Sequence, residues 1–487
     1  MNHHYLDRHT AKDLLKLQQM EKRFVEAAFN NPSCVDKSNE QKIRYALNLA
    51  KISTFQPGAA GMGRNDRPDI TVENLALVNL RNYLIDTLGR SLAKGKPELA
   101  VLIDAQQSIP LWEDKIEPTV QAILQDHSDD FSAEELNREI GTKTLVNVCG
   151  GGGGSGYVYI GAYEALEQAS YIPGYLLGAS IGSVLGLFRS KHKIGNYDED
   201  VKFAQSLSPG EIFNVVSLKA RFGLPGLLRF YLHAAIQDRF VHPDGSPMLL
   251  SDLEIPFETV VAGVNRGAMG FSPEEYAREH HLILDKMPSK MALGRKITAQ
   301  LIRMLAFINP MVTKEIIIGG DSLTADFNAV DAAGFSSAIP GILHYDIARN
   351  DDHMTEMLEA LFMREDLMCL VDGGIINNVP VRSAWNQVHN GKIGTRNCYY
   401  LGFDCFHPQL TLNHALTLPV EYALQTQVAV NHPFAHNIIK FKPTLAPANL
   451  VPSAESIDKS YGWGFKQMNE NIPLTNKFFE TVEWPES

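Results

Sequence analysis

The residue with the clearest chemical signature is Ser180, within the sequence Gly178-Ala179-Ser180-Ile181-Gly182. Small residues on both sides of a serine permit the sharp strand-to-helix turn that exposes a nucleophilic hydroxyl. The apolar run 175–178 predicts a strand, and a helix is expected to begin at Ile181. This context favours Ser180 as the nucleophile of a serine hydrolase, with helix N-capping by its hydroxyl as the alternative.

A glycine-rich segment, Gly150 to Gly154, follows a short apolar strand that is expected over 145–149. Its Gly-x-Gly-x-x-Gly form fits a dinucleotide-binding loop, but the next strand lacks the acidic residue that would bind a ribose. No Gly-Lys-Ser/Thr follows, so a Walker-type phosphate loop is excluded. Unobstructed backbone N–H groups at such a turn can instead stabilise an oxyanion. The predicted oxyanion hole comprises Gly151, Gly152, Gly153 and Gly154, and Gly156 completes the motif.

A serine hydroxyl needs a base that accepts its proton. Asp372 ends an apolar strand expected over 367–371 and is followed by Gly373 and Gly374. In a parallel sheet the carboxyl ends of the strands meet at one edge, so Asp372 is expected to approach Ser180 and to act as this base. Capping of the next turn is the alternative role for Asp372. A Ser–His–Asp arrangement also stays open, with its histidine drawn from His344, His407, His432 and His436.

The elements that position these residues alternate as strand, glycine turn and helix, which predicts an α/β fold with a mainly parallel sheet. Further strands are expected over 257–264 and 398–403, and mainly helical insertions over about 190–250 and 275–310. Three parts are predicted along the chain. They are a helical N-terminal extension (1–140), a catalytic domain (141–410) and a helical or irregular C-terminal part that packs on it (411–487).

The glycine loop, the pentapeptide around Ser180 and Asp372-Gly373-Gly374, in this order, resemble the patatin-like phospholipase family. The flanking text agrees with the family pattern, and the similarity covers about residues 143–405. The agreeing segments are Ile160 to Glu167 after the glycine loop, Ser336 to Gly341 before the aspartate, and Asn377 to Pro380 after it.

The resemblance implies a three-layer α/β/α fold and a Ser–Asp dyad that hydrolyses acyl esters of glycerolipids through an acyl-enzyme. Ser180 would attack, Asp372 would serve as base, and the N–H groups of Gly152 to Gly154 would hold the oxyanion. Ser155 departs from the family, which usually has Arg or Lys at this position. Some members need an activating protein or lipid cofactor, and residues 1–140 are a candidate place for such a regulator to act.

The expected substrates are therefore phospholipids or lysophospholipids at a membrane surface. The alternatives are a Ser–His–Asp esterase and a catalytically silent lipid- or partner-binding protein of the same fold. A chain of 487 residues with a net charge of −12 does not favour nucleic-acid binding. Its five cysteines form no C-x-x-C pair or zinc-ligand spacing, so neither a metal nor another cofactor is expected.

No stretch of the sequence is apolar and long enough for a membrane span, and the N-terminus has no signal-peptide core. A cytoplasmic protein, peripheral at membranes, is expected, and secretion without a cleaved signal stays open. Two basic amphipathic segments, Lys290 to Asn309 and Val215 to Leu232, are candidate helices for a lipid surface or a lid. The alternative is that each is the packed face of an ordinary surface helix.

Overall fold

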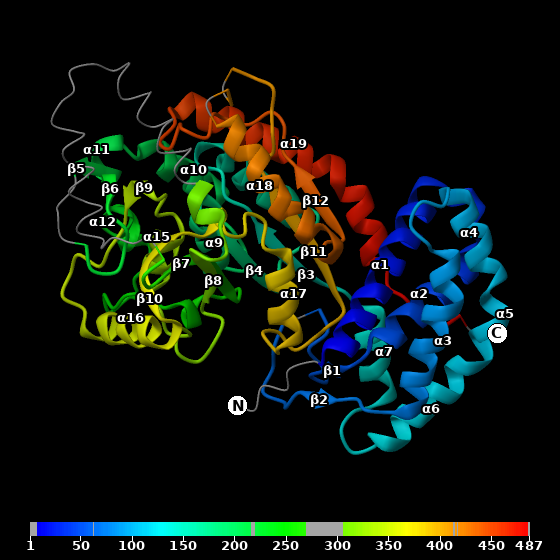
Figure 1. Ribbon diagram of the computed structural model, residues 1–487. Coiled ribbons are helices and arrows are strands. Elements are labelled where there is room, and N and C mark those ends of the chain that lie inside the picture. Colours follow the sequence, from blue (N-terminus) through cyan, green and yellow to red (C-terminus); the bar gives the residue numbers. More distant parts are fainter. Residues whose placement is uncertain are drawn as a thin grey trace.

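The computed structural model describes residues 7–61, 63–215, 220–268, 305–412, 414–415 and 417–485. Within these residues no helix is both long and apolar enough to cross a membrane. The N-terminal part is helical, as expected, and has an apolar core of its own. Figure 1 shows its helices grouped beside the sheet. They are α1 (Arg8–Asn30), α2 (Lys37–Lys51), α3 (Leu75–Ser91), α4 (Glu98–Gln107), α5 (Ile109–Trp112), α6 (Ile116–Asp126) and α7 (Ala133–Gly141), with a short hairpin of β1 (Thr54–Phe55) and β2 (Ile70–Thr71) between α2 and α3.

A seven-stranded sheet forms the centre of the catalytic part, in the order β10-β7-β4-β3-β11-β12, with β8 paired to β7. The pairs β4–β7, β3–β4, β11–β3 and β11–β12 are parallel, whereas β10 and β8 are antiparallel to β7. The sheet is thus mainly parallel, as predicted. The strands are β3 (Thr144–Cys149), β4 (Tyr175–Ala179), β7 (Phe257–Asn265), β8 (Thr313–Ile318), β10 (Leu367–Asp372), β11 (Cys398–Asp404) and β12 (Asn437–Lys440).

One register relationship corrects the reasoning from the sequence. The first half of β7 pairs with β4, and Val260 lies opposite Ala179. The second half pairs with β10, and Val261 lies opposite Asp372. Because β8 occupies the other edge of β7 over both halves, β4 and β10 share one edge and meet end to end. Asp372 therefore reaches Ser180 from an antiparallel strand that runs toward it, not from a parallel neighbour.

Helices cover both faces of the sheet, which gives the predicted three-layer α/β/α fold. Alternate strand residues point to opposite sides, so Leu145 and Leu176 join one apolar core while Val146 and Leu177 join another. On the first side lie α8 (Val158–Gln168), α9 (Ile181–Lys191), α15 (Ala329–Ser336) and α19 (Ala454–Phe479), and on the second lie α1, α17 (Val381–His389) and α18 (Leu418–Asn431).

The insertion expected to be mainly helical over about 190–250 also contains strands. Its strands β5 (Phe213–Val215) and β6 (Gly226–Phe230) form a small sheet with β9 (Gly341–His344), which lies later in the chain. The helices of the insertion are α10 (Tyr197–Ser206), α11 (Pro209–Ile212) and α12 (Leu232–Ile236), and α16 (Asp352–Glu365) follows β9. The described part of Val215 to Leu232 is thus a strand with its flanks rather than an amphipathic helix, because its apolar residues pair with β9. Most of the insertion expected over about 275–310, including residues 290–304 of Lys290 to Asn309, lies outside the described residues.

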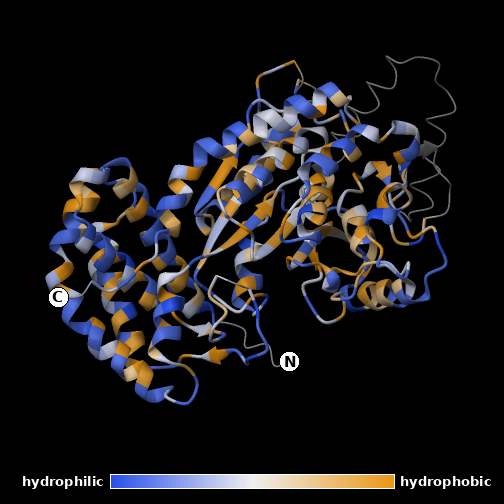
Figure 2. Ribbon diagram, turned by 180° about the vertical axis from the view of Figure 1, so that it is seen from behind, coloured by the Kyte–Doolittle hydropathy of each residue, from blue (hydrophilic) through white to orange (hydrophobic). Residues whose placement is uncertain are grey.

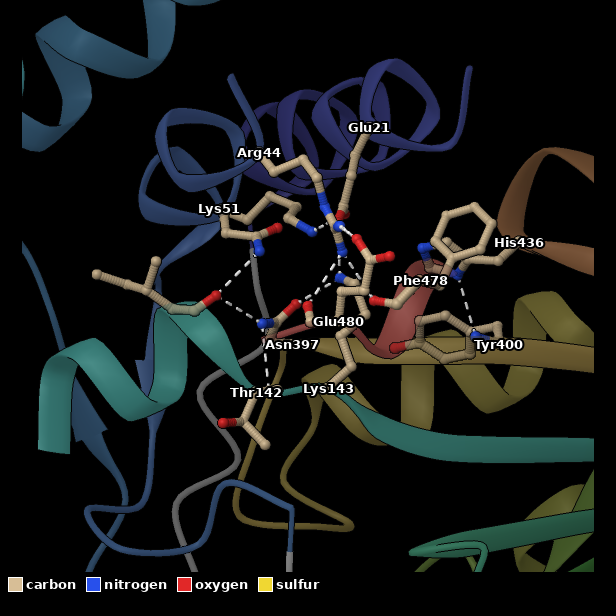
Figure 3. A network of polar contacts seen from close by, with 12 residues as sticks. Glu21, Arg44, Lys51, Thr142, Lys143, Asn397, Tyr400, His436, Phe478 and Glu480 are labelled. Carbon is tan, nitrogen blue, oxygen red and sulfur yellow. Dashed lines mark hydrogen bonds and ion pairs between the residues drawn. The ribbon is translucent and has the colours of Figure 1, made fainter. Parts of the chain in front are cut away.

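The N-terminal helices join the sheet through a buried ionic network, which Figure 3 shows. Lys143, next to the start of β3, lies 2.8 Å from Glu21 Oε1 on α1, and Lys51 on α2 pairs with the same carboxylate. Burial lowers the pKa of Lys143 to about 7, although Glu21 opposes this shift. Arg44 donates to the carbonyl oxygen of Phe478 at the end of α19, 3.0 Å away. The helical extension is therefore locked to the ends of the catalytic part.

Candidate active site

Ser180 lies at the turn between β4 and α9, with φ 54° and ψ −129°. A positive φ is unusual for a residue with a side chain and marks a strained, sharp turn. A Cβ on Gly182 would lie 2.3 Å from the carbonyl oxygen of Cys149, so only glycine fits there. The hydroxyl of Ser180 does not cap α9. The sequence therefore folds locally into the predicted nucleophile turn.

The hydroxyl of Ser180 points at Asp372. Its Oγ donates a 2.6 Å hydrogen bond to Asp372 Oδ2. The other carboxylate oxygen, Oδ1, accepts the N–H of Gly374 at 2.7 Å, so Asp372 also caps the turn that follows it. Both residues are buried, at 6% and 4% exposure. The carboxylate thus caps the turn that follows it, and this capping bond orients the other oxygen toward the serine hydroxyl.

Burial controls the protonation of Asp372. Removal from water raises the pKa of its carboxyl group to about 7, and the hydrogen bonds from Ser180 and Gly374 only partly oppose this shift. A carboxylate with its ordinary pKa near 3.9 would be a weak proton acceptor at neutral pH. The raised pKa brings Asp372 into the range where a general base works best.

Ser336, which was not identified as a functional residue from the sequence, holds the turn that carries Ser180. Ser336 Oγ accepts the N–H of Ser180 at 3.0 Å and donates to the carbonyl oxygen of Val260 at 2.6 Å. Since its single proton goes to Val260, it must also accept the hydroxyl of Ser183, 2.7 Å away. The end of α15 is thereby tied to β7, to α9 and to the turn that follows β4, which gives Ser336 a structural role in the Ser336 to Gly341 segment.

The glycine loop lies against the nucleophile. A Cβ on Gly151 would come within 2.8 Å of the Ser180 Cβ. The N–H groups of Gly151 and Gly154 are engaged within the protein, with Asn378 Oδ1 at 2.9 Å and the Pro447 carbonyl at 3.0 Å. Gly152 and Gly153 take φ values of 155° and 54°, and their N–H groups have no partner among the described residues. Of the four glycines predicted to form the oxyanion hole, only Gly152 and Gly153 therefore have N–H groups without a partner among the described residues.

Ser155, where the family usually has a cation, is fully buried beneath a C-terminal segment. Its Oγ donates to the carbonyl oxygen of Leu445 at 2.9 Å. Tyr157 in turn donates to the carbonyl oxygen of Leu450 at 3.2 Å. We call residues 445–451 the strap, because this segment crosses the glycine loop. A small hydroxyl at residue 155 is what allows the strap to lie this close.

Asn378 lies in the Asn377 to Pro380 segment that agrees with the family pattern, but its role could not be identified from the sequence. Its Oδ1 accepts the Gly151 N–H, which fixes the orientation of the side-chain amide. Its Nδ2 is buried and has no hydrogen-bond partner among the described residues. Asn378 lines the same cavity as Ser180 and Asp372. A buried donor without a partner is costly, and a ligand in this cavity can satisfy it.

Two cavities share Ser180 in their walls. The narrower one, about 110 Å³, is lined mainly by apolar and aromatic side chains, among them Val184, Leu185, Phe188, Phe203, Ala204 and Phe230, although Arg189 and Asp200 also belong to its wall. The wider one, about 370 Å³, contains Asp372 and lies against the strap, with Asn378, Phe406, Thr417, Leu424, Ala448 and Asn449 in its walls. Ser180 therefore lies between a narrower and a wider cavity, and both have mainly apolar walls.

The four histidines considered as bases make other contacts. His344 Nδ1 lies 3.0 Å from the carbonyl oxygen of Leu224, and His407 Nε2 lies 3.1 Å from that of Phe441. His436 Nδ1 accepts the Tyr400 N–H in the network of Figure 3. None of the four, His432 included, hydrogen bonds to Ser180 or Asp372 in the part of the chain described. Ser180 and Asp372 are thus in direct contact, without a histidine between them in the part of the chain described.

Comparison with protein families places this site inside a known domain. Residues 148–385 match the family model described as patatin-like phospholipase. The match begins within β3 and ends within α17, so it includes the glycine loop, Ser180, Ser336, Asp372 and Asn378. It does not include the N-terminal helices or the strap. A search of curated proteins gave no match.

Proposed function

We propose that this chain, whose residues 148–385 match the patatin-like phospholipase family, is a lipid acyl hydrolase that cleaves phospholipids or lysophospholipids with Ser180 as nucleophile and Asp372 as base. The observation that carries this assignment is the 2.6 Å hydrogen bond from Ser180 Oγ to Asp372 Oδ2. It directs the proton of the nucleophile to a buried carboxylate. A catalytically silent role is less well supported, because both residues are intact and in contact.

In the first step Asp372 takes the proton of Ser180 as Oγ bonds to the carbonyl carbon of the ester. The electron pair of the carbonyl double bond moves to its oxygen, which the N–H groups of Gly152 and Gly153 stabilise. Collapse of this intermediate breaks the carbon–oxygen bond of the ester. Asp372 returns the proton to the departing alkoxide, which leaves an acyl group on Ser180.

The second step repeats this chemistry with water. Asp372 removes a proton from a water molecule, whose oxygen attacks the carbonyl carbon of the acyl-enzyme. The same two N–H groups hold the oxyanion, and the bond to Ser180 breaks as the serine regains a proton from Asp372. One carboxylate therefore serves as base and acid in turn, and its raised pKa suits both roles.

The two cavities suggest how the substrate lies. We assign the acyl chain to the narrow apolar cavity, because transfer of its methylene groups from water to apolar walls stabilises binding. The alcohol part of the substrate then occupies the wider cavity, where Asn378, Thr417 and Asn449 offer polar contacts. This placement sets the ester carbonyl between Ser180 and the glycine loop.

The test combines a covalent probe with product analysis. A fluorophosphonate should label Ser180 in the wild-type chain and leave Ser180→Ala unlabelled. Phosphatidylcholine and lysophosphatidylcholine should each be offered, and fatty-acid release measured for wild type, Ser180→Ala and Asp372→Asn. We expect release by the wild type and its loss in both variants. Unchanged release by Asp372→Asn would rule out the dyad, and labelling at another residue would rule out Ser180.

A further inference from the structure

The loop between β11 and α18, described over residues 405–412, 414–415 and 417, displays two leucines to solvent. Leu410 is 82% exposed and Leu412 is 96% exposed. This loop projects above α18 in Figure 1, and its tip is coloured as hydrophobic in Figure 2. Exposed leucines are common singly, but two alternate residues at a loop tip form a distinct apolar feature.

The sequence of this loop is unusual for so acidic a chain. Residues 405–417 contain no Asp, Glu, Lys or Arg, although the protein has a net charge of −12. Its two histidines, His407 and His414, are buried. The loop can therefore leave water without the desolvation of a charged side chain.

A buried polar network anchors the base of the loop. His414 Nδ1 lies 2.8 Å from Glu421 Oε1 on α18, and its Nε2 lies 3.0 Å from Thr444 Oγ1. Gln409 donates to the same Thr444 oxygen at 2.9 Å. Thr444 directly precedes the strap, which lies on the glycine loop. These hydrogen bonds connect the loop that carries the leucines to α18 and, through Thr444, to the strap beside the glycine loop.

The same loop also borders the wider cavity. Phe406 and Thr417, at its two ends, lie in the cavity wall beside Leu424 of α18. Leu228, 38% exposed, and the exposed Ala448 of the strap belong to this wall as well. Apolar surface therefore extends from the cavity wall to the outside of the protein, close to the loop that carries Leu410 and Leu412.

We propose that Leu410 and Leu412 insert into a lipid surface and dock the mouth of the wider cavity against it. This inference rests on the proposed function, since it assigns the place where a lipid acyl hydrolase would meet its aggregated substrate. Two leucines offer far less area than the roughly 800 Å² per partner that a stable protein interface buries. They suit shallow insertion into a bilayer interface, which requires only a few apolar side chains.

The test measures partition onto vesicles of pure phosphatidylcholine, whose zwitterionic surface isolates the apolar contribution. All proteins carry Ser180→Ala, so that the lipid is not consumed. We expect Leu410→Ser/Leu412→Ser to bind at least about tenfold more weakly than its parent, because two side chains lose their transfer from water. The matched control is Met363→Ser, at a residue that is 82% exposed on α16, a helix that lies far from α18 in Figure 1. It should bind like the parent.

A second measurement keeps the proposal independent of folding. Leu412→Trp should retain binding, and its fluorescence should shift to the blue on vesicles relative to the parent. Thermal unfolding checks that each variant is folded. Absence of vesicle binding by the parent, or unchanged binding of the serine double variant, would overturn the proposal. So would a dimer that the double variant converts to monomer with vesicle binding unchanged, because the leucines would then join two copies.

Hydrolysis by the wild-type chain is measured separately. Vesicle binding that depends on Leu410 and Leu412, together with no fatty-acid release, would refute the proposed function and leave the docking surface standing. Fatty-acid release together with vesicle binding that does not depend on Leu410 and Leu412 would refute the docking surface and support the proposed function.

Discussion

The hydroxyl of Ser180 donates a 2.6 Å hydrogen bond to Asp372 Oδ2 at the point where β4 and β10 meet end to end along β7. The two strands run toward each other, so nucleophile and base are each the last residue before a turn. A hydrogen bond from a backbone N–H group to a side chain holds each turn. The N–H of Ser180 donates to Ser336 Oγ, and the N–H of Gly374 donates to Asp372 Oδ1. The geometry of the dyad is therefore set by the sheet and its turns.

Loss of either dyad member should nearly abolish catalysis. Ser180→Ala removes the nucleophile, and Asp372→Asn keeps the shape of the base but cannot accept the proton. We expect each to lower kcat by at least about 10³-fold, and the double variant to lose little more, since the two act as a unit. Steady-state hydrolysis of a soluble ester gives these values. If the free-energy losses that the two single variants show in kcat added up in the double variant, Ser180 and Asp372 would not act as a unit.

The activity should depend on the ionisation of Asp372. Only the deprotonated carboxylate can act as base, and burial raises its pKa to about 7. We therefore expect kcat/KM to increase with pH, to reach half its maximum near pH 7 and to level off above about pH 8. A profile measured with a soluble ester tests this. A rate that is constant from about pH 5 to 8 would show that the base has an ordinary carboxyl pKa.

The same raised pKa has a consequence for stability. The folded protein holds the proton of Asp372 more tightly than the unfolded chain does, so this group destabilises the fold as pH rises from about 4 to 7. Asp372→Asn lacks this loss and can keep both hydrogen bonds. We expect it to be more stable than wild type at pH 8, by on the order of 1–4 kcal/mol, and to lose this advantage near pH 4. Denaturant unfolding at the two pH values provides the measurement.

Asn378 should contribute through its unpartnered Nδ2. Asn378→Asp preserves the acceptor for the Gly151 N–H but replaces the free donor with a second carboxylate oxygen near Asp372. We expect kcat/KM to fall about 10²-fold, as for loss of one donor in an oxyanion hole, and the midpoint of the pH profile to move upward. A purely structural role would lower stability without moving this midpoint. Asn386→Asp, at an exposed residue of α17 outside the cavity walls, is the control for the added charge.

Filling the narrow cavity should change the preferred acyl length. Ala204 of α10 lies in the wall of this cavity, and Ala204→Phe would shorten the space beyond Ser180. We expect long-chain esters to lose about tenfold or more in kcat/KM relative to butyryl esters. Ala448→Phe, in the wall of the wider cavity, should leave this ratio unchanged. A series of nitrophenyl esters of increasing acyl length makes the comparison, and an equal loss at every length would reject the assignment.

The network of Figure 3 should be needed for stability. Burial alone would raise the pKa of Glu21, but Lys143 and Lys51 hold it below its ordinary value. Glu21→Gln leaves the buried Lys143 and the half-buried Lys51 without their partner, which should cost about 3–5 kcal/mol in the free energy of unfolding. Glu26→Gln, on the same helix, breaks only a half-exposed 3.9 Å pair and should cost less than about 1 kcal/mol. Denaturant titration compares the two variants.

Much of the fold could be predicted from the sequence because its strands are short apolar runs that end in glycine turns. Strands were expected over 145–149, 257–264 and 398–403, and β3, β7 and β11 occupy these places. The antiparallel entry of β10 could not be deduced, because an apolar run carries no information on strand direction. The small sheet was missed because β5, β6 and β9 are short and depend on one another for pairing.

The site was partly predictable for a similar reason. Ser180, Asp372 and the glycines stand at turns where few residue types fit, so their pattern is visible in one sequence. Ser336 and Asn378 act through single hydrogen bonds formed across the fold, and a serine or asparagine in a loop has many other uses. The strap lies nearly 300 residues after the glycine loop, with a separation of 290 between Ser155 and Leu445. No local pattern connects such segments.

The shared edge of β7 has a consequence for how such enzymes can diversify. Ser180 and Asp372 are separated by 192 residues in the chain, yet β7, together with Ser336 at the end of α15, sets the gap between the ends of the strands that carry them. The rest of the connecting chain, which builds the walls of the acyl cavity, can lengthen, shorten or be exchanged without altering that gap. Substrate preference can therefore drift while reactivity is conserved, and segments grafted between α9 and β7 offer a route to new specificities.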